Sequence, residues 1–201
     1  MKPLAYCLFE TPLGWCGIAW SERGNRPAVT FLQLPEATPE MTESRLAQDS
    51  RARPSSAPPP EIREVIERVR KHLQGDVQDF RDVAVDLEGR GLFARRVYAA
   101  AREIPAGETR TYGEIAAALN LPAAARAVGQ ALGRNPVGVI IPCHRVLAAG
   151  GKPGGFSAYG GRATKTRLLE IEGALAQRSL LDMHEILNRT ETRRSTKEKA
   201  S

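Results

Sequence analysis

Cysteine is scarce in this chain of 201 residues, and long apolar runs are absent. The three cysteines, Cys7, Cys16 and Cys143, are too few and too scattered to form a disulfide framework, which favours a reducing compartment. No apolar run approaches the ~18 residues that identify a membrane-spanning helix, and the first residues lack the pattern of a signal peptide. We therefore expect neither membrane insertion nor export, and a cytoplasmic location.

Residue sets that hold metals or nucleotides are also missing. Cys7 and Cys16 fall inside expected strands, and the nearest histidine in the sequence is His72, so the ligand spacing of a zinc site is absent. We expect both to be core thiols. The glycine-rich stretch 150–161 matches neither the phosphate-loop nor the dinucleotide-binding fingerprint, because no strand and helix flank it at the required spacing. The sequence predicts neither a metal nor a cofactor.

The formal net charge of +6 is distributed unevenly. Residues 1–90 carry 12 Lys and Arg against 14 Asp and Glu, a net of −2, whereas residues 91–173 carry 11 against 5, a net of +6. Residues 174–201 carry 6 against 4, a net of +2. A concentrated positive field attracts polyanions, although many basic domains bind none. Charge alone therefore leaves nucleic-acid binding open.

The first ninety residues have the pattern of a small α/β domain. Short strands separated by Pro- and Gly-containing turns are expected at residues 5–9, 15–20 and 28–34. The Pro- and Ser-rich composition of residues 35–60 predicts a long surface loop. A helix is expected from Glu61 to Gly75, because apolar residues recur at helical intervals and glycine commonly ends a helix. A further strand is expected at residues 83–87.

From Gly91 the composition shifts towards alanine, and we place a domain boundary near residue 90. Helices are expected over residues 93–104 and 164–171, the second with Leu168 and Leu169 facing inward. Two short alanine-rich helices, at 109–119 and 123–132, have the outline of a helix-turn-helix. An ordinary pair of antiparallel helices is the alternative. Residues 174–201 form a C-terminal extension that we expect to be partly disordered.

Cys143 lies in the stretch with the clearest chemical character. The β-branched run at residues 137–141 predicts a short buried strand, which Pro142 ends. Proline suits the start of a helical turn, where unpaired N–H groups would stabilise a thiolate and lower the thiol pKa. His144 could then act as a general base, for example through one water. The alternative is that Cys143 is a small buried hydrophobe.

Motifs over residues 90–173 resemble, in order and spacing, those of the O6-alkylguanine-DNA alkyltransferases, also called methylated-DNA-protein-cysteine methyltransferases. The matching elements are Thr111-Tyr112-Gly-Glu-Ile-Ala, Ala125-Arg126-Ala-Val-Gly129, Arg134-Asn135-Pro136, Ile141-Pro-Cys-His-Arg-Val146, Gly160-Gly161 and the helix from Lys165 to Gly173. The first ninety residues resemble the family only in outline. The resemblance implies an α+β fold. A small β-sheet domain with a helix, ribonuclease-H-like in outline, precedes a mostly helical domain with a helix-turn-helix of winged-helix type.

The resemblance also implies a reaction. Cys143 would accept one methyl or other alkyl group from O6 of guanine, or from O4 of thymine, in a single irreversible displacement. His144 would activate the thiol through a water, and Glu172 would orient His144, which follows the logic of a catalytic triad. Tyr112 would donate a proton to the departing base, and Asn135 would brace the turn before Cys143. No cofactor enters this reaction.

The implied partner is double-stranded DNA containing O6-alkylguanine, bound by a monomer through the minor groove. The target base must leave the stack, and Arg126 would fill the vacated space. The residues implied to contact DNA are Thr111, Ala125, Arg126, Ala127, Gly129 and Arg134. The residues implied to line the substrate pocket are Pro142, Arg145, Val146, Ser157, Tyr159 and Gly160. Backbone carbonyls of Cys143 and Val146 would hold the guanine edge.

Ala158 and Tyr159 depart from the family pattern, because some members have an aromatic residue followed by a small one there. The resemblance therefore does not define which alkyl groups are accepted. A non-catalytic alkylguanine-binding or regulatory helix-turn-helix protein is the alternative function. Such binders replace the cysteine, whereas this chain has Cys143, His144 and Glu172 together. A thiol hydrolase would need an oxyanion hole that the sequence does not display.

Overall fold

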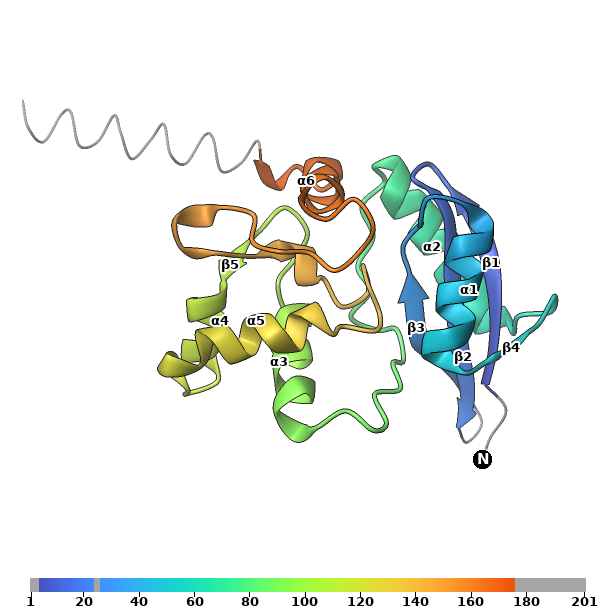
Figure 1. Cartoon of the computed structure of the whole chain (residues 1–201), viewed down its shortest axis with the longest axis horizontal. Helices are drawn as coiled ribbons and strands as arrows, with labels where there is room; N and C mark the ends of the chain where they lie inside the picture. The colour runs from blue at the N-terminus through green and yellow to red at the C-terminus, as the bar shows by residue number, and fades with distance from the viewer. Residues whose placement is uncertain (1–3, 24–25, 176–201) are drawn as a thin grey trace, which may run out of the picture.

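The computed structural model describes residues 4–23 and 26–175, so the predicted C-terminal extension lies outside the described residues except for its first two positions. Within this part, the chain forms a four-stranded sheet, a short two-stranded pair and six α-helices. The sheet with α1 and α2 makes up one half of the molecule, and the remaining helices make up the other (Figure 1). The architecture is mixed α+β, as predicted.

The sheet contains the three predicted strands, each longer than or shifted from its expected range. They are β1 (Leu4–Thr11), β2 (Gly14–Arg23) and β3 (Arg26–Gln33). Neighbours among the three pair antiparallel, and the short β4 (Arg53–Pro54) lies parallel to β1, which gives the order β3-β2-β1-β4. Gly14, at φ 118°, allows the tight turn between β1 and β2.

The loop predicted for residues 35–60 is wrong over much of its length, because the helix α1 (Pro39–Ser50) occupies it. The Thr38 hydroxyl accepts a hydrogen bond from the backbone N–H of Met41, and Pro39 begins the helix. Leu46 is fully buried above Gly17, where a Cβ would lie 2.5 Å from the Leu46 side chain. The N-cap at Thr38 and the burial of Leu46 against the sheet stabilise a helix here in spite of the polar composition of the segment.

The predicted second helix is present as α2 (Pro60–Gln74), and Gly75 ends it at φ 102°. The helices α1 and α2 cover opposite faces of the sheet. Ala19 packs with Leu46 of α1, whereas its neighbour Ile18 belongs to the cluster that contains Ile62 of α2. Side chains on a strand alternate between faces, which explains the division.

The strand predicted at residues 83–87 is wrong. This segment makes a single parallel bridge, between Val85 and Val29 of β3. The guanidinium group of Arg102 instead donates to three carbonyl oxygens, those of Phe80, Arg81 and Val83. Of these carbonyls only that of Val83 belongs to the predicted strand, and the backbone bonds to β3 are limited to Val29, which donates to Ala84 O and accepts from Asp86 N.

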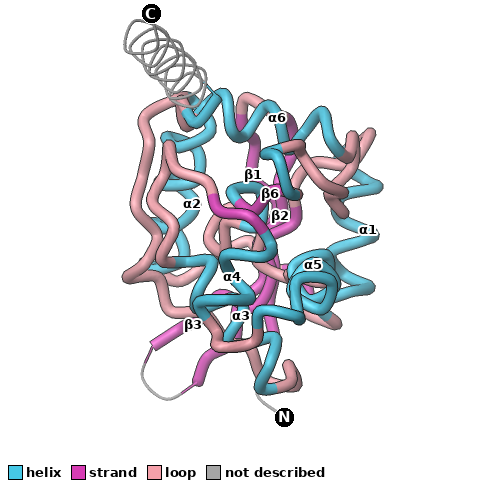
Figure 2. The backbone as a smooth tube through the Cα atoms, turned by 90° about the vertical axis from the view of Figure 1, so that its left-hand side faces the viewer, coloured by secondary structure: helices cyan, strands magenta, loops and turns pink. Residues whose placement is uncertain are grey.

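The helical half contains three mutually packed helices, α3 (Leu92–Arg102), α4 (Tyr112–Ala118) and α5 (Ala125–Gly133) (Figure 2). Thr111 and Glu114 cap the start of α4 with reciprocal hydrogen bonds. The chain breaks at Asn120, at φ 60°, and passes through the 3₁₀ turn η1 (Pro122–Ala124) into α5. The two predicted short helices and the break between them are confirmed.

Residues 137–141 are buried but do not form the predicted strand. Val137 makes one bridge to Leu32, and the chain then turns, with Val139 at φ 67°. The side chain of Asn135 bonds both ends of this turn, because its Oδ1 accepts from Val137 N and its Nδ2 donates to Ile141 O. The predicted helical turn follows Pro142 as η2 (Cys143–Arg145).

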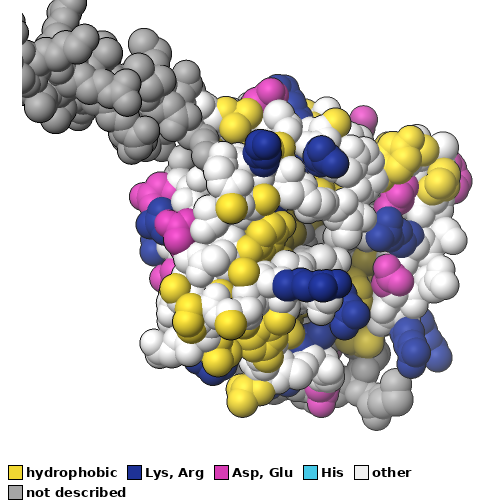
Figure 3. Space-filling view, turned by 60° about the vertical axis from the view of Figure 1, so that its left-hand side comes forward, with side chains coloured by type: hydrophobic (Ala, Val, Ile, Leu, Met, Phe, Trp, Pro, Cys, Tyr) yellow, Lys and Arg dark blue, Asp and Glu magenta, His cyan; other side chains and the backbone are white. Residues whose placement is uncertain are grey.

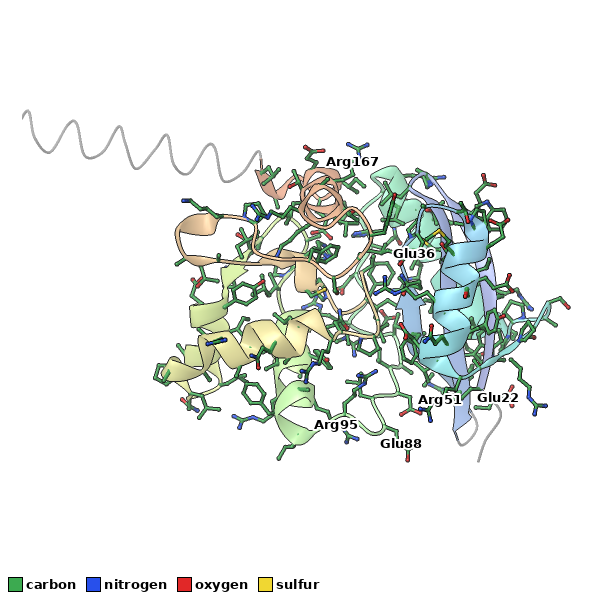
Figure 4. The ribbon with its side chains drawn as sticks, in the orientation of Figure 1. Glu22, Glu36, Arg51, Glu88, Arg95 and Arg167 are labelled. Carbon is green, nitrogen blue, oxygen red and sulfur yellow. The ribbon has the colours of Figure 1, made fainter. Side chains whose placement is uncertain are left out.

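The chain after Cys143 completes the helical half. β6 (Val146–Leu147) pairs in parallel with β5 (Arg110–Thr111), and η3 (Ala149–Gly151) begins the glycine-rich segment. In α6 (Arg162–Ile171), Leu168 and Leu169 are buried as predicted, while Arg167 points outward (Figure 4).

One hydrophobic cluster runs through both halves of the molecule. It includes Ile18 and Leu32 of the sheet together with Val97, Ile141 and Leu168 of the helical half. A domain boundary near residue 90 stays a prediction. Among the described residues, no helix is long and apolar enough to cross a membrane.

Candidate active site

Asn135 holds the turn that carries Cys143. Its amide nitrogen donates to the carbonyl oxygen of Ile141 at 2.8 Å and lies 3.3 Å from Cys143 Sγ. The same side chain accepts from Val137 N at 3.0 Å. Asn135 therefore fixes the backbone on both sides of the turn and also donates to the sulfur, as expected for a residue that braces this segment.

The pKa of the Cys143 thiol is raised, contrary to the prediction from the helical turn. Burial is the main cause, because Cys143 is only 8% exposed and a thiolate loses its hydration there. The Asn135 hydrogen bond, the charge of Lys165 and the backbone N–H groups of residues 143 and 144 act in the opposite direction. The resting sulfur therefore carries its proton, and a base is required to remove it.

His144 and Glu172 form a buried hydrogen-bonded pair. Nε2 of His144 lies 2.8 Å from Oε1 of Glu172, and both side chains are fully buried. Among the described residues, Nδ1 of His144 has no hydrogen-bond partner. The arrangement leaves the proton of the neutral ring on Nε2 and a lone pair on Nδ1. This is the geometry of a base with an orienting carboxylate.

Glu172 accepts hydrogen bonds from His72 and Arg145 as well as from His144, the one partner predicted from the sequence. Arg145 donates from Nε to Oε2 at 2.9 Å and from Nη2 to Oε1 at 2.8 Å. Burial raises the pKa of the Glu172 carboxyl, but His144, His72 and Arg145 together lower it well below its usual range. The predicted place of Arg145 in the substrate pocket stays a prediction. Its side chain is buried against Glu172 and the carbonyl oxygen of Ile104.

His72 is a second histidine at this carboxylate, and the sequence analysis missed it. It extends from α2, is fully buried, and its Nε2 lies 3.0 Å from Oε1 of Glu172. A signal was present, because the apolar residues that recur at helical intervals in this helix include Val69 and Leu73, and position 72 lies on the same face. Its partner, 100 residues away in the sequence, had no such signal.

Lys165 is another buried residue near Cys143 to which the sequence analysis gave no role. It is fully buried, and its Nζ donates to the carbonyl oxygen of Val146 at 2.6 Å and lies 5.8 Å from the centre of the Tyr112 ring. Burial lowers the pKa of Lys165. The Val146 carbonyl predicted to hold a guanine edge thus already accepts from Lys165, and the Cys143 carbonyl accepts from Val146 N.

A cavity of about 530 Å³ is lined by Cys143 and by five other predicted residues. Its lining includes Tyr112 at the start of α4, Arg126 on α5 and Ser157 of the glycine-rich segment. Ala125 and Gly129, also predicted, line it too, as does Phe156, which was not predicted. Figure 3 shows this side of the molecule, where Lys and Arg side chains lie next to hydrophobic ones around a hollow.

Other predicted residues lie elsewhere. Arg134 lines a second cavity of about 290 Å³ between the two halves, which also reaches Cys143. Pro142 lines a third cavity of about 190 Å³ that does not include Cys143. Tyr159 is 53% exposed and lines none of these cavities, and Gly160 at φ 78° sits against Thr164 instead. The roles of Pro142, Tyr159 and Gly160 in the substrate pocket, and of Arg134 in DNA binding, stay predictions.

Two of the residues predicted to contact DNA, Thr111 and Ala127, belong to the start of α4 and to α5. Thr111 is the N-cap of α4, so its hydroxyl is engaged by the backbone of Glu114. Ala127 is exposed on α5, the helix that also carries Arg126. Within residues 4–23 and 26–175, no group of three or more His, Cys, Asp or Glu side chains is placed to hold a metal ion.

The fold and site define a protein with a buried cysteine, a hydrogen-bonded imidazole–carboxylate pair that begins at the next residue, and a cavity lined by this cysteine and by residues of α5. Residues 92–174 match the family model described as the DNA binding domain of 6-O-methylguanine DNA methyltransferase. The methylated-DNA–protein-cysteine methyltransferase of Mycolicibacterium paratuberculosis is 36% identical over 169 residues, which cover 84% of this chain and 92% of that protein. The Mycobacterium leprae protein of the same name is 44% identical over 164 residues, covering 81% and 88%.

Solved structures agree with the sequence relatives. The Mycobacterium tuberculosis O6-methylguanine methyltransferase superposes with a TM-score of 0.67 at 36% identity, over 85% of this chain and 93% of that one. A structure of the M. tuberculosis protein in complex with DNA gives 0.66 at 35% identity, with the same coverage. The chain belongs to the methylated-DNA–protein-cysteine methyltransferase family.

Proposed function

We propose that this protein repairs DNA by moving a methyl or other alkyl group from O6 of guanine, and from O4 of thymine, to Cys143. The observation that carries the proposal is the arrangement at the sulfur. The buried Cys143 thiol is hydrogen-bonded to Asn135 and lines a cavity with Tyr112 and Arg126, and the next residue, His144, is hydrogen-bonded to Glu172. No group in this arrangement provides a second step that would remove the alkyl group, so each molecule acts once.

The proposed reaction is one in-line displacement. Nδ1 of His144 receives the thiol proton through a water, and Glu172 stabilises the imidazolium that forms. The thiolate attacks the alkyl carbon, a carbon–sulfur bond forms, and the bond from carbon to O6 breaks with its electron pair leaving on the guanine. Tyr112 then protonates the departing base. Burial raises the pKa of Tyr112, so the hydroxyl keeps its proton until the base becomes a strong acceptor.

The proposed substrate is duplex DNA carrying an O6-alkylguanine, bound by one molecule of this protein. The net charge of +6 over residues 91–173 supplies the attraction to phosphates. Small residues on α5, among them Ala125, Ala127 and Gly129, allow close approach to a minor groove. The alkyl carbon is inaccessible in a stacked duplex, so the base is flipped at a cost of a few kcal/mol.

The finer description of the fold belongs to the same proposal. The sheet half would be ribonuclease-H-like in outline, and α4 with α5 would be a helix-turn-helix of winged-helix type. The division into domains of residues 1–90 and 91–173 is supported by the change in charge and composition. The cytoplasmic location and the monomeric state are expectations from the sequence.

The proposal is tested by incubating the protein with DNA that carries one O6-methylguanine. We expect stoichiometric repair, and a tryptic peptide of residues 135–145 that is heavier by the mass of one methylene group. Mass spectrometry of the digest measures the peptide, and digestion of the DNA to nucleosides measures repair. Tight binding with an unmodified peptide and unrepaired DNA would show a binding protein instead.

Arg126→Ala tests the role of α5. Arg126 lines the cavity beside Cys143, and its proposed place is the gap left in the base stack. We expect the rate of repair of duplex DNA to fall about tenfold or more, because base flipping loses a partner worth a few kcal/mol. Transfer from free O6-methylguanine should hardly change, since no base is flipped. Equal losses on both substrates would contradict the intercalating role.

A further inference from the structure

Two histidines from opposite halves of the molecule share one carboxylate oxygen. Oε1 of Glu172 lies 3.0 Å from Nε2 of His72 and 2.8 Å from Nε2 of His144, and all three side chains are fully buried. His144 belongs to the turn that carries Cys143, whereas His72 belongs to α2 under the sheet. Of these two histidines, only His144 has a role in the proposed alkyl transfer. The position of His72 therefore needs a separate explanation.

The hydrogen bonds of His72 define its protonation. The backbone N–H of Gln78 points at Nδ1 at 3.1 Å, so Nδ1 accepts and carries no proton. The proton of the neutral ring therefore lies on Nε2 and is donated to Glu172. Phe80 packs against the ring in an edge-on arrangement, with 5.3 Å between the ring centres. His72 is a fixed donor, held by the backbone on one side and by an aromatic ring on the other.

This donor changes what Glu172 offers to His144. Oε1 accepts from His72, His144 and Arg145, while within the described part of the chain Oε2 accepts from Arg145 alone. Each additional donor draws negative charge away from the bond with His144. A carboxylate whose charge is shared stabilises an imidazolium less, so His144 holds a proton less tightly. Burial lowers the pKa of His144, Glu172 raises it, and Arg145 and His72 lower it further.

A base of this kind is useful only if it is neutral when the thiol proton must be taken. An imidazole that is too basic would already be protonated at physiological pH and could accept nothing from Cys143. The shared carboxylate keeps His144 oriented without making it strongly basic. The same hydrogen bond connects α2 with the end of α6, which makes the first half of the chain part of the reaction site.

We propose that His72 is a positioning residue for the alkyl transfer, holding the Glu172 carboxylate and keeping His144 neutral and oriented. The proposal rests on the proposed function, since it concerns the same site. The groups that act on His144 are Glu172 from α6, His72 from α2 and Arg145 from its own turn. A change at His72 alone therefore isolates its contribution.

His72→Gln and His72→Met form a matched pair for the test. The two side chains are similar in length, but only glutamine keeps an N–H donor. With duplex DNA containing O6-methylguanine, we expect the methionine variant to transfer the methyl group about tenfold more slowly at neutral pH, since a hydrogen bond to a charged group is lost. The acid limb of its pH–rate profile should move to higher pH. The glutamine variant should keep the wild-type profile.

Leu46→Ala is the control for a purely structural effect. Leu46 is fully buried on the other face of the sheet, in a separate hydrophobic cluster with Tyr6 and Ala19. Its truncation therefore lowers the stability of the protein without changing a contact of Glu172. Its pH–rate profile should match that of the wild type. If His72→Met does not fold, His72→Phe, which keeps a ring and lacks the donor, replaces it.

Nuclear magnetic resonance titration of histidine-labelled protein separates this inference from the proposed function. His144 should take up a proton at higher pH in His72→Met than in the wild type, whether or not the protein transfers alkyl groups. An unchanged titration and an unchanged pH–rate profile in both donor-free variants would overturn the role of His72. Equal impairment in the glutamine and methionine variants would overturn it as well, because packing alone would then explain the loss. A wild type that leaves Cys143 unmodified would overturn the proposed function and with it any part for His72 in transfer.

Discussion

Cys143→Ala protein is expected to bind DNA containing O6-methylguanine and to leave the methyl group in place indefinitely. The sulfur is the proposed acceptor, and alanine has no atom that could take its place. His144 Nδ1 is buried and has no hydrogen-bond partner among the described residues, while Asn135 carries an amide that is not nucleophilic. Transfer should therefore fall below detection rather than by a finite factor.

Binding should survive the same substitution. Phosphate contacts dominate the affinity of most DNA-binding proteins, and Cys143 lies at the bottom of a cavity and is only 8% exposed. Alanine removes one atom from that cavity and introduces no charge. Fluorescence anisotropy with a labelled duplex, compared at one fixed salt concentration, measures the affinity. A loss of binding as large as the loss of transfer would mean that the thiol holds the substrate and is not simply the acceptor.

Cys7→Ala is the matched control. Cys7 is partly buried in β1, and burial raises the pKa of its thiol to about 11, with no imidazole or carboxylate among its described hydrogen-bond partners. The variant should repair DNA at the wild-type rate. Appearance of the methyl group on the peptide containing Cys7 in the Cys143→Ala protein would contradict the assignment of the acceptor.

The chemistry near Cys143 was readable from the sequence because its signals are local. A proline before the cysteine predicts the turn, and Leu168 and Leu169 mark the inner face of α6 through helical spacing. The helix α1 also had a local start signal in Thr38 and Pro39, but the Pro- and Ser-rich residues after it led to a loop prediction for the whole segment.

What the sequence could not provide depends on contacts between distant segments. The pairing of His72 with Glu172 spans 100 residues, and no periodicity connects the two. Lys165 would ordinarily be solvated, and it is buried because the Val146 carbonyl provides an acceptor. The direction of the Cys143 pKa shift was mispredicted for the same reason. A helical turn is a local feature, whereas the desolvation that outweighs it comes from the packing of the whole site.

Glu172→Gln should have the second largest effect, and it should act on both the reaction and the stability. Four hydrogen bonds from His72, His144 and Arg145 converge on the carboxylate. An amide has one acceptor oxygen and an NH₂ group that faces donors, so some of these donors lose their partner. The Arg145 guanidinium is left buried without a counter-charge, and removing one partner of a buried ion pair costs about 3–5 kcal/mol of unfolding free energy.

The rate should fall further than in any change at His72. Without a carboxylate, the imidazolium that forms on His144 is not stabilised and its ring is not held in one tautomer. An orienting carboxylate replaced by its amide costs roughly a thousandfold or more in a triad of this kind. Single-turnover kinetics at a temperature where the variant remains folded measures the loss. A rate within a factor of about three of the wild type would contradict the orienting role.

The same variant should change how stability depends on pH. The pKa of Glu172 is lowered by folding, so the stability it contributes is fully present above the ordinary carboxyl value of 4.5 and is lost as the pH falls below it. The pKa of His144 is also lowered by folding, so its protonation opposes folding as the pH falls below 6.5. The wild type should therefore lose stability on acidification from about pH 6.5 and continue to lose it below about pH 4.5.

Glu172→Gln protein should lose the lower part of this dependence, because it has no carboxylate there to protonate. Urea unfolding between neutral and acid pH measures the free energy of unfolding for both proteins. Glu170→Gln is the control, since Glu170 lies on the same helix and makes an exposed ion pair with Arg167 at 3.3 Å, which is worth less than about 1 kcal/mol. Its pH dependence should follow the wild type. Parallel curves for Glu172→Gln and the wild type below about pH 4.5 would mean that the buried carboxylate is not the group whose charge the fold depends on.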